Sequence, residues 1–157
     1  MNKIISINNF LLIFLGFFSF FINYYYGNIG VFPIDTFAFF DTGYNILLDR
    51  HPFKDVWITT GPLVDYLQAI FFKFFGLNWK SYIIHASFLN LATTIIFYLV
   101  LVQFKLDKYL SFFYSISLSI LCYTVSGAPF AYTHSYVLSL ISLLIFFLLI
   151  NTESKLS

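Results

Sequence analysis

Long runs of hydrophobic residues, broken at only a few places by polar ones, dominate this chain of 157 residues. A helix needs about 20 apolar residues to cross the hydrocarbon core of a bilayer. Four runs approach or reach that length, and we predict membrane-spanning helices over residues 7–26, 81–103, 109–125 and 135–150. Lipid offers no hydrogen bonds to the backbone, so the spans must be helical. The pattern predicts an all-α polytopic membrane protein that forms one module, residues 1–157.

The exception to the apolar pattern is the loop of residues 27–80, between the first two spans. It contains five of the seven acidic residues of the chain: Asp35, Asp41, Asp49, Asp55 and Asp65. A chain this apolar keeps charged groups where water reaches them or where chemistry needs them. The loop is therefore the place where we expect a functional site.

Within this loop, two shorter segments have helix signals. Asp35 precedes apolar residues at helical spacing, and an aspartate at that position accepts hydrogen bonds from the free N–H groups of a first turn. Pro62 suits the first turn of a second helix, whose run is too short to span a membrane and includes Lys73. We predict two short interfacial helices, residues 36–48 and 62–75, along the membrane surface.

Composition supports the membrane assignment and excludes other classes. The chain is 60% hydrophobic and only 10% charged, whereas soluble domains are about 25% charged. A net charge of +1 and the lack of a basic tract exclude a nucleic-acid partner. Cys122 is the only cysteine, so no disulfide forms within the chain. The first apolar run could be a signal peptide, but it ends in three tyrosines without an Ala-x-Ala-like site, which favours an uncleaved span.

Basic residues give the expected orientation. Four lie in the loop of residues 27–80 and four outside it, so their number alone does not decide. Lys3 before the first span and the lysine-rich turn at residues 104–108 favour a cytoplasmic position for these two segments. We therefore predict that the loop is external or periplasmic, in a bacterial inner (cell) membrane.

No glycine-rich phosphate loop, nucleophile elbow or histidine pair at metal-ligand spacing is present. Instead, acids and turns follow one another in a fixed order. These are Asp35, then Ile46-Leu47-Leu48, Pro52-Phe53-Lys54-Asp55 with Trp57, Gly61-Pro62-Leu63 and Phe74-Phe75-Gly76. The ordered set resembles the first external loop of type-C membrane glycosyltransferases, which include protein O-mannosyltransferases, lipid A aminoarabinose transferases and enzymes related to the core-sugar transferases of rhizobial lipopolysaccharide. Thr36 stands where the family commonly has a second acid.

The resemblance implies transfer of a sugar from a lipid-linked donor, a polyprenyl phosphate, to an acceptor on the outer side of the membrane. Asp35 would be the general base that deprotonates the acceptor hydroxyl, and it can cap the following helix at the same time. Arg50, His51 and Lys54 would lie near the donor phosphate, or they are interfacial residues whose charged ends reach water. Asp55 would help to bind substrate, or it caps its turn.

The resemblance implies no organic cofactor. Some members of the family use a divalent metal near these acids, but this sequence offers too few oxygen ligands to place one. Three further residues have two interpretations each. Asp41 is a residue of a solvated helix face or part of the site. His85, inside a span, is a functional candidate or a hydrogen-bond partner of a neighbouring helix. His134 faces the same site or is an interfacial histidine.

The chain is shorter than members of this family, which usually have eight or more spans, and we expect it to correspond to their N-terminal part. The alternative hypothesis is a small four-span membrane protein without catalysis. It would be a translocator of lipid-linked sugars or an accessory subunit with a membrane partner. A translocator would be expected to place polar groups inside its spans.

Overall fold

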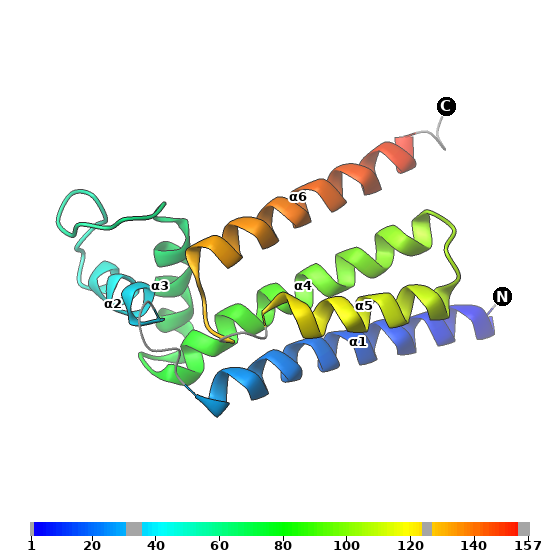
Figure 1. The fold of residues 1–157 in the computed structure, drawn as a ribbon, viewed down its shortest axis with the longest axis horizontal. Coiled ribbons are helices and arrows are strands. Elements are labelled where there is room, and N and C mark those ends of the chain that lie inside the picture. Colours follow the sequence, from blue (N-terminus) through cyan, green and yellow to red (C-terminus); the bar gives the residue numbers. More distant parts are fainter. Residues whose placement is uncertain (1, 31–35, 124–126, 154–157) are drawn as a thin grey trace.

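A computed structural model describes residues 2–30, 36–123 and 127–153, and their regular structure is helical (Figure 1). In this part of the chain the elements are α1 Asn2–Ile29, α2 Thr36–Leu47, α3 Leu63–Phe75, α4 Trp79–Gln103, α5 Lys108–Cys122 and α6 Ala131–Glu153. The predicted all-α class is confirmed. The long helices run lengthwise, and α2 and α3 lie together at the end of the bundle opposite to the N- and C-termini (Figure 1).

Three of the long helices are apolar enough and long enough to cross a membrane. Their candidate spans are Asn9–Ile29, Trp79–Gln103 and Ala131–Ile150, and they indicate an integral membrane protein. α5 has 15 residues, and at about 1.5 Å per residue it extends about 22 Å, less than the roughly 30 Å of hydrocarbon. The fourth crossing therefore stays a prediction.

Side-chain caps set the first residues of α4 and α5. The side-chain oxygen of Asn78 accepts a hydrogen bond from the backbone N–H of Ser81 at 2.9 Å. Asp107 accepts from the N–H groups of the next turn at 2.9 and 3.1 Å. α4 thus begins at Trp79, two residues before the predicted span. α6 also begins earlier than predicted, at Ala131, four residues before the expected start.

α4 is the central helix, packed against α1, α3, α5 and α6. The buried amide of Asn90 on α4 donates to the carbonyl oxygen of Ser19 on α1 at 2.9 Å and to that of Ser119 on α5 at 3.0 Å. At the C-terminal end of α4, Gln103 donates to the carbonyl oxygen of Leu148 on α6 at 3.0 Å. Such interhelical hydrogen bonds hold helices together where lipid removes the hydrophobic driving force between them.

Small hydroxyl residues allow α5 to approach its neighbours closely. Ser111, Ser115 and Ser119 are fully buried on one face of the helix, and each hydroxyl donates to a backbone carbonyl one turn earlier. The fourth serine of the helix, Ser117, is exposed. Because the hydroxyls are satisfied within their own helix, they can face a neighbouring helix without an unpaired group.

α2 and α3, with their connection at residues 48–62, form what we call the cap. Phe40 of α2 packs edge-on against Phe72 of α3 and Tyr82 of α4, with ring centroids 4.8 and 5.5 Å apart. These contacts bury the apolar faces of α2 and α3 and seat them on the start of α4. The two helices match the predicted ranges within one residue at each end, and their interfacial position stays a prediction.

Gly27 at the end of α1 touches the turn before α6. Gly127 has a φ of +64°, and a Cβ there would overlap backbone atoms of Gly27. The carbonyl of Gly127 accepts a hydrogen bond from the buried amide of Asn23 at 3.1 Å, and the carbonyl of Gly27 accepts one from the indole N–H of Trp79 at 3.1 Å. This glycine contact joins α1, α4 and the α5–α6 turn directly beneath the cap.

We predict that Gly127→Ala destabilises the protein by at least about 2 kcal/mol, because the new methyl group meets backbone and the left-handed φ disfavours alanine. Thermal unfolding in detergent measures the change. Gly61→Ala is the matched control, since nothing lies within 4 Å of its new Cβ. Equal melting temperatures for the two variants would contradict the importance of the glycine contact.

Candidate functional site

The cap encloses an open cavity of about 260 Å³ between α2, the connection and α3. α2 contributes Ala38, Phe39, Asp41 and Thr42, the connection contributes residues 56–60, and α3 contributes Asp65. The cavity joins two carboxylates and three threonines to an apolar wall, so it combines polar groups with apolar surface as small-molecule sites do. We call it the cap cavity.

Asp65 is the most unusual residue of the cap cavity. Its side chain is only 1% exposed, and its Oδ2 atom has no hydrogen-bond partner among the residues that the structure describes. Burial raises the pKa of this carboxyl from its ordinary value of 3.8 to about 6, partly offset by a hydrogen bond from its own backbone N–H. Five other buried side-chain atoms of the described residues also lack a partner, but Asp65 is the only one of these residues that lines the cap cavity, and this combination marks a candidate functional group.

The described lining of the cap cavity offers hydrogen-bond acceptors and no cation. Asp41 and Asp65 supply carboxylate oxygens, and the hydroxyl of Thr42 donates to the carbonyl of Ala38 at 2.9 Å, which leaves its lone pairs free to accept. No lysine, arginine or histidine lines the cavity among the described residues. The site is therefore suited to a ligand that donates hydrogen bonds and unsuited to a phosphate.

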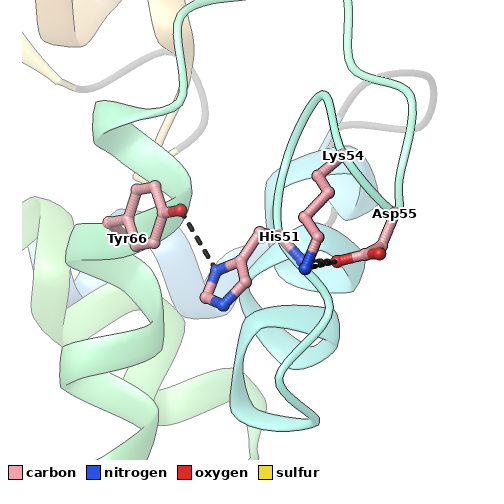
Figure 2. A network of polar contacts seen from close by, with 4 residues as sticks. All are labelled: His51, Lys54, Asp55 and Tyr66. Atoms are coloured by element: carbon pink, nitrogen blue, oxygen red, sulfur yellow. Dashed lines mark hydrogen bonds and ion pairs between the residues drawn. The ribbon is translucent and has the colours of Figure 1, made fainter.

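Two of the predicted phosphate-binding residues, His51 and Lys54, lie in a turn (Figure 2) that directly precedes Val56 of the cavity wall. The backbone N–H of His51 donates to Oδ2 of Asp55 at 2.9 Å, and Nζ of Lys54 lies 4.0 Å from the same oxygen. Nδ1 of His51 lies 3.2 Å from the hydroxyl oxygen of Tyr66 on α3. Phe53 has a φ of +65°, which a bulky side chain rarely adopts. The turn is thus sharply folded, and Tyr66 fixes it to α3.

The structure brings His51, Lys54 and Asp55 together, with Arg50 exposed next to them in the chain. The predicted role of Asp55 in closing its turn is confirmed by its hydrogen bond to His51, while contacts of this turn with substrate stay predictions. The Lys54 side chain is 75% exposed, so its charge is open to an approaching anion. Asp35, the predicted base, lies outside the described residues; α2 begins at the next residue, Thr36.

Sequence reasoning did not single out Asp65, which it named only as one of the five acids of the loop. On α3 the buried residues include Asp65, Gln68, Ala69 and Phe72, which share one face at helical spacing. The position of Asp65 and Gln68 on the same helix face as the apolar Ala69 and Phe72 was the signal in the sequence that could have indicated their burial. Asp41 is exposed as predicted for a solvated face, and it also lines the cap cavity.

A buried hydrogen-bonded chain leads from α3 into the bundle. Nδ1 of His85 lies 2.9 Å from Oε1 of Gln68, and its Nε2 lies 3.1 Å from Nε2 of His134. Nδ1 of His134 in turn lies 2.8 Å from the hydroxyl of Tyr123. Hydrogen bonds to neighbouring helices, the simpler interpretation of His85, are therefore confirmed. Both imidazoles are 1% exposed and neither lines the cap cavity.

The donors and acceptors of this chain have a consistent direction. An amide oxygen only accepts, so His85 donates from Nδ1 to Gln68 and must accept at Nε2 when neutral. His134 then donates from Nε2 and accepts the Tyr123 hydroxyl at Nδ1. The carbonyl oxygen of Phe130 lies 3.1 Å from that Nδ1 and is an acceptor for the opposite tautomer. The chain thus links α3, α4, α6 and the end of α5.

Comparisons with models of protein families, with curated proteins and with solved structures find no match to this chain. The ordered residues of the loop and the geometry of the cap are therefore the basis for any functional assignment.

Asp65 should make stability depend on pH in a definite direction. Its raised pKa means that the folded state binds the proton more tightly, so stability is highest below pH 4 and falls as the pH rises to about 6. The loss is on the order of 3 kcal/mol, at about 1.36 kcal/mol per pH unit. Asp65→Asn should remove it and should be the more stable protein at pH 8, as melting temperatures from pH 4 to pH 8 would measure. The same pH profile in both proteins would contradict this role of burial.

Proposed function

We propose that this chain is a membrane glycosyltransferase module that moves a sugar from a polyprenyl-phosphate donor to a hydroxyl group on the outer face of the membrane. The observation that carries the proposal is the unpartnered carboxylate of Asp65 in an open cavity of the cap. Two motifs of the resemblance lie at this cavity: Trp57 lines it, and the turn of residues 52–55 directly precedes Val56 of its wall.

The chemistry requires a base and a place for the leaving phosphate. In an inverting transfer the acceptor oxygen bonds to the anomeric carbon, its proton passes to a carboxylate, and the bond between that carbon and the phosphate oxygen breaks. Asp35 is the proposed base, since it directly precedes the helix that supplies Asp41 and Thr42 to the cavity. We propose that Arg50, His51 and Lys54, which lie outside the cavity, bind the phosphate of the donor there.

Apolar surface near the cap suits a lipid-linked donor. A hollow of about 490 Å³ between α3 and α4 is lined by Ile70, Phe71, Phe74, Phe75 and Phe88. Its aromatic and aliphatic wall is compatible with an isoprenoid chain, which would enter it from the hydrocarbon region while its phosphate stays at the cap. This arrangement supports a donor anchored in the membrane.

A second candidate is the non-catalytic four-span protein, as a translocator of lipid-linked sugars or an accessory subunit. The chain of Gln68, His85, His134 and Tyr123 favours it, because a translocator places polar groups between its spans. Sugar transfer decides between the two candidates: the enzyme forms a new glycoside, whereas the translocator leaves the donor chemically unchanged.

We predict that Asp35→Asn lowers sugar transfer by about 100-fold or more, the usual contribution of a general base. The assay follows labelled sugar from polyprenyl-phosphate donors in membranes that contain the protein. Asp49→Asn is the control, because it is the same chemical change in the same loop at a position with φ +57°, which asparagine tolerates.

Full transfer by Asp35→Asn at equal membrane insertion would remove Asp35 from the mechanism. No transfer by the unaltered protein from any of the labelled donors, with the donor moved across the membrane, would favour the translocator instead.

A further inference from the structure

We propose that the cap cavity binds a neutral, hydroxyl-rich group of sugar size through Asp65 and Trp57, and that the donor phosphate stays outside it. This inference rests on the proposed function and specifies it: the group in the cavity is the polyol of the acceptor. The argument uses the charge of the cavity, the unpaired oxygen within it, its size and its aromatic wall.

Charge decides which half of the reaction fits the cavity. Two carboxylates line it without a basic residue among the described lining, so a phosphate there would meet repulsion and find no cation. The turn beside the cavity contains Lys54, which pairs with Asp55 but is 75% exposed, and the exposed Arg50 precedes it in the chain. The two surfaces thus separate a site for hydrogen-bond donors from a site for an anion.

Asp65 in the cavity wall carries an unpaired acceptor. Oδ2 of Asp65 is buried and unpaired, and leaving such a group unsatisfied costs about 1–3 kcal/mol or more. A ligand hydroxyl that donates to this oxygen recovers that loss on binding. One carboxylate oxygen of Asp41, by contrast, lies 3.2 Å from the side-chain nitrogen of Asn45 and is already engaged.

Two other kinds of ligand, a divalent cation and an ammonium group, fit the cavity less well. A divalent cation takes six or more oxygen ligands, and the described residues contain no group of three acidic, histidine or cysteine side chains able to hold a metal. An ammonium group would use the charge but not the apolar wall of Phe39, Val56 and Ile58. A ring that has hydroxyls at its edge and C–H groups on its faces uses both.

The cavity volume and Trp57 favour such a ring. At about 260 Å³ the cavity is smaller than the roughly 300–1,000 Å³ of sites for drug-sized ligands, so it suits one monosaccharide unit. The Trp57 side chain is 83% exposed although it lines the cavity. The electron-rich face of an indole attracts the C–H groups of a sugar ring, and an exposed indole at the wall provides that surface.

Tryptophan fluorescence tests the proposal directly, because Trp57 and Trp79 are the only tryptophans of the chain. The protein is placed in phospholipid nanodiscs, without sugar-based detergent, and titrated with methyl glycosides of several hexoses. We expect a saturable change in fluorescence with at least one of them, and its absence in Trp57→Phe. Inorganic phosphate and Mg²⁺ should give none.

Asp65→Asn should weaken the binding of that glycoside about 10- to 100-fold, the usual range for a hydrogen bond to a charged group. Asp49→Asn should bind it as the unaltered protein does. Because Asp65→Asn removes a buried charge, it should fold at least as well at neutral pH, so weaker binding would not reflect unfolding. Binding should also strengthen as the pH rises through about 6 and Asp65 becomes an anion.

Equal glycoside affinity in Asp65→Asn and the unaltered protein would overturn the proposal. So would a saturable response to Mg²⁺ or to phosphate in place of the glycosides, or no response to any glycoside. Glycoside binding without sugar transfer would support this inference and count against the proposed enzyme. Sugar transfer without glycoside binding at Trp57 would support the proposed enzyme and count against this inference.

Discussion

Side-chain amides that reach across helices are the interaction on which this structure depends. In lipid, apolar helices gain little by leaving the hydrocarbon for one another, so packing and hydrogen bonds decide their arrangement. Asn90 connects α4 to α1 and α5, and Gln103 connects it to α6. Asn23 of α1 donates to Ser87 of α4 at 3.0 Å. Asn23 and Asn90 are fully buried and Gln103 is half-buried, so an unpaired donor at these positions would be costly and the bonds help to fix the register of the helices.

The cap inherits its position from this bundle. α3 sits on the start of α4, and Trp79 connects that start to the end of α1 beside the glycine contact. The cap cavity therefore opens on a rigid base, as functional loops usually do. Asp65 works against stability in the same place, since its charge is buried without a partner. Such local destabilisation is common where a residue serves a ligand.

The hydrogen-bonded chain of Gln68, His85 and His134 connects the cap to the start of α6. Gln68 lies one helical turn from Asp65 on the same face of α3, and from it the hydrogen bonds run through His85 to His134 on α6. A change in the position of α3 must therefore alter contacts of α6. The acidic cavity and the neighbouring turn, where the Lys54 amine is open to solvent, give the cap two chemically distinct surfaces.

The sequence by itself determined the helical class, the apolar spans and the two helices of the cap, because these follow from local periodicity and from the need to satisfy the backbone in lipid. It also indicated the turn at Pro52, whose signals lie within a few residues. Only the tertiary structure decided that the buried Asp65 lines one cavity with Trp57 and that His85 meets His134. These pairs are far apart in the chain or face each other across helices, so their contacts depend on how α2, α3, α4 and α6 pack.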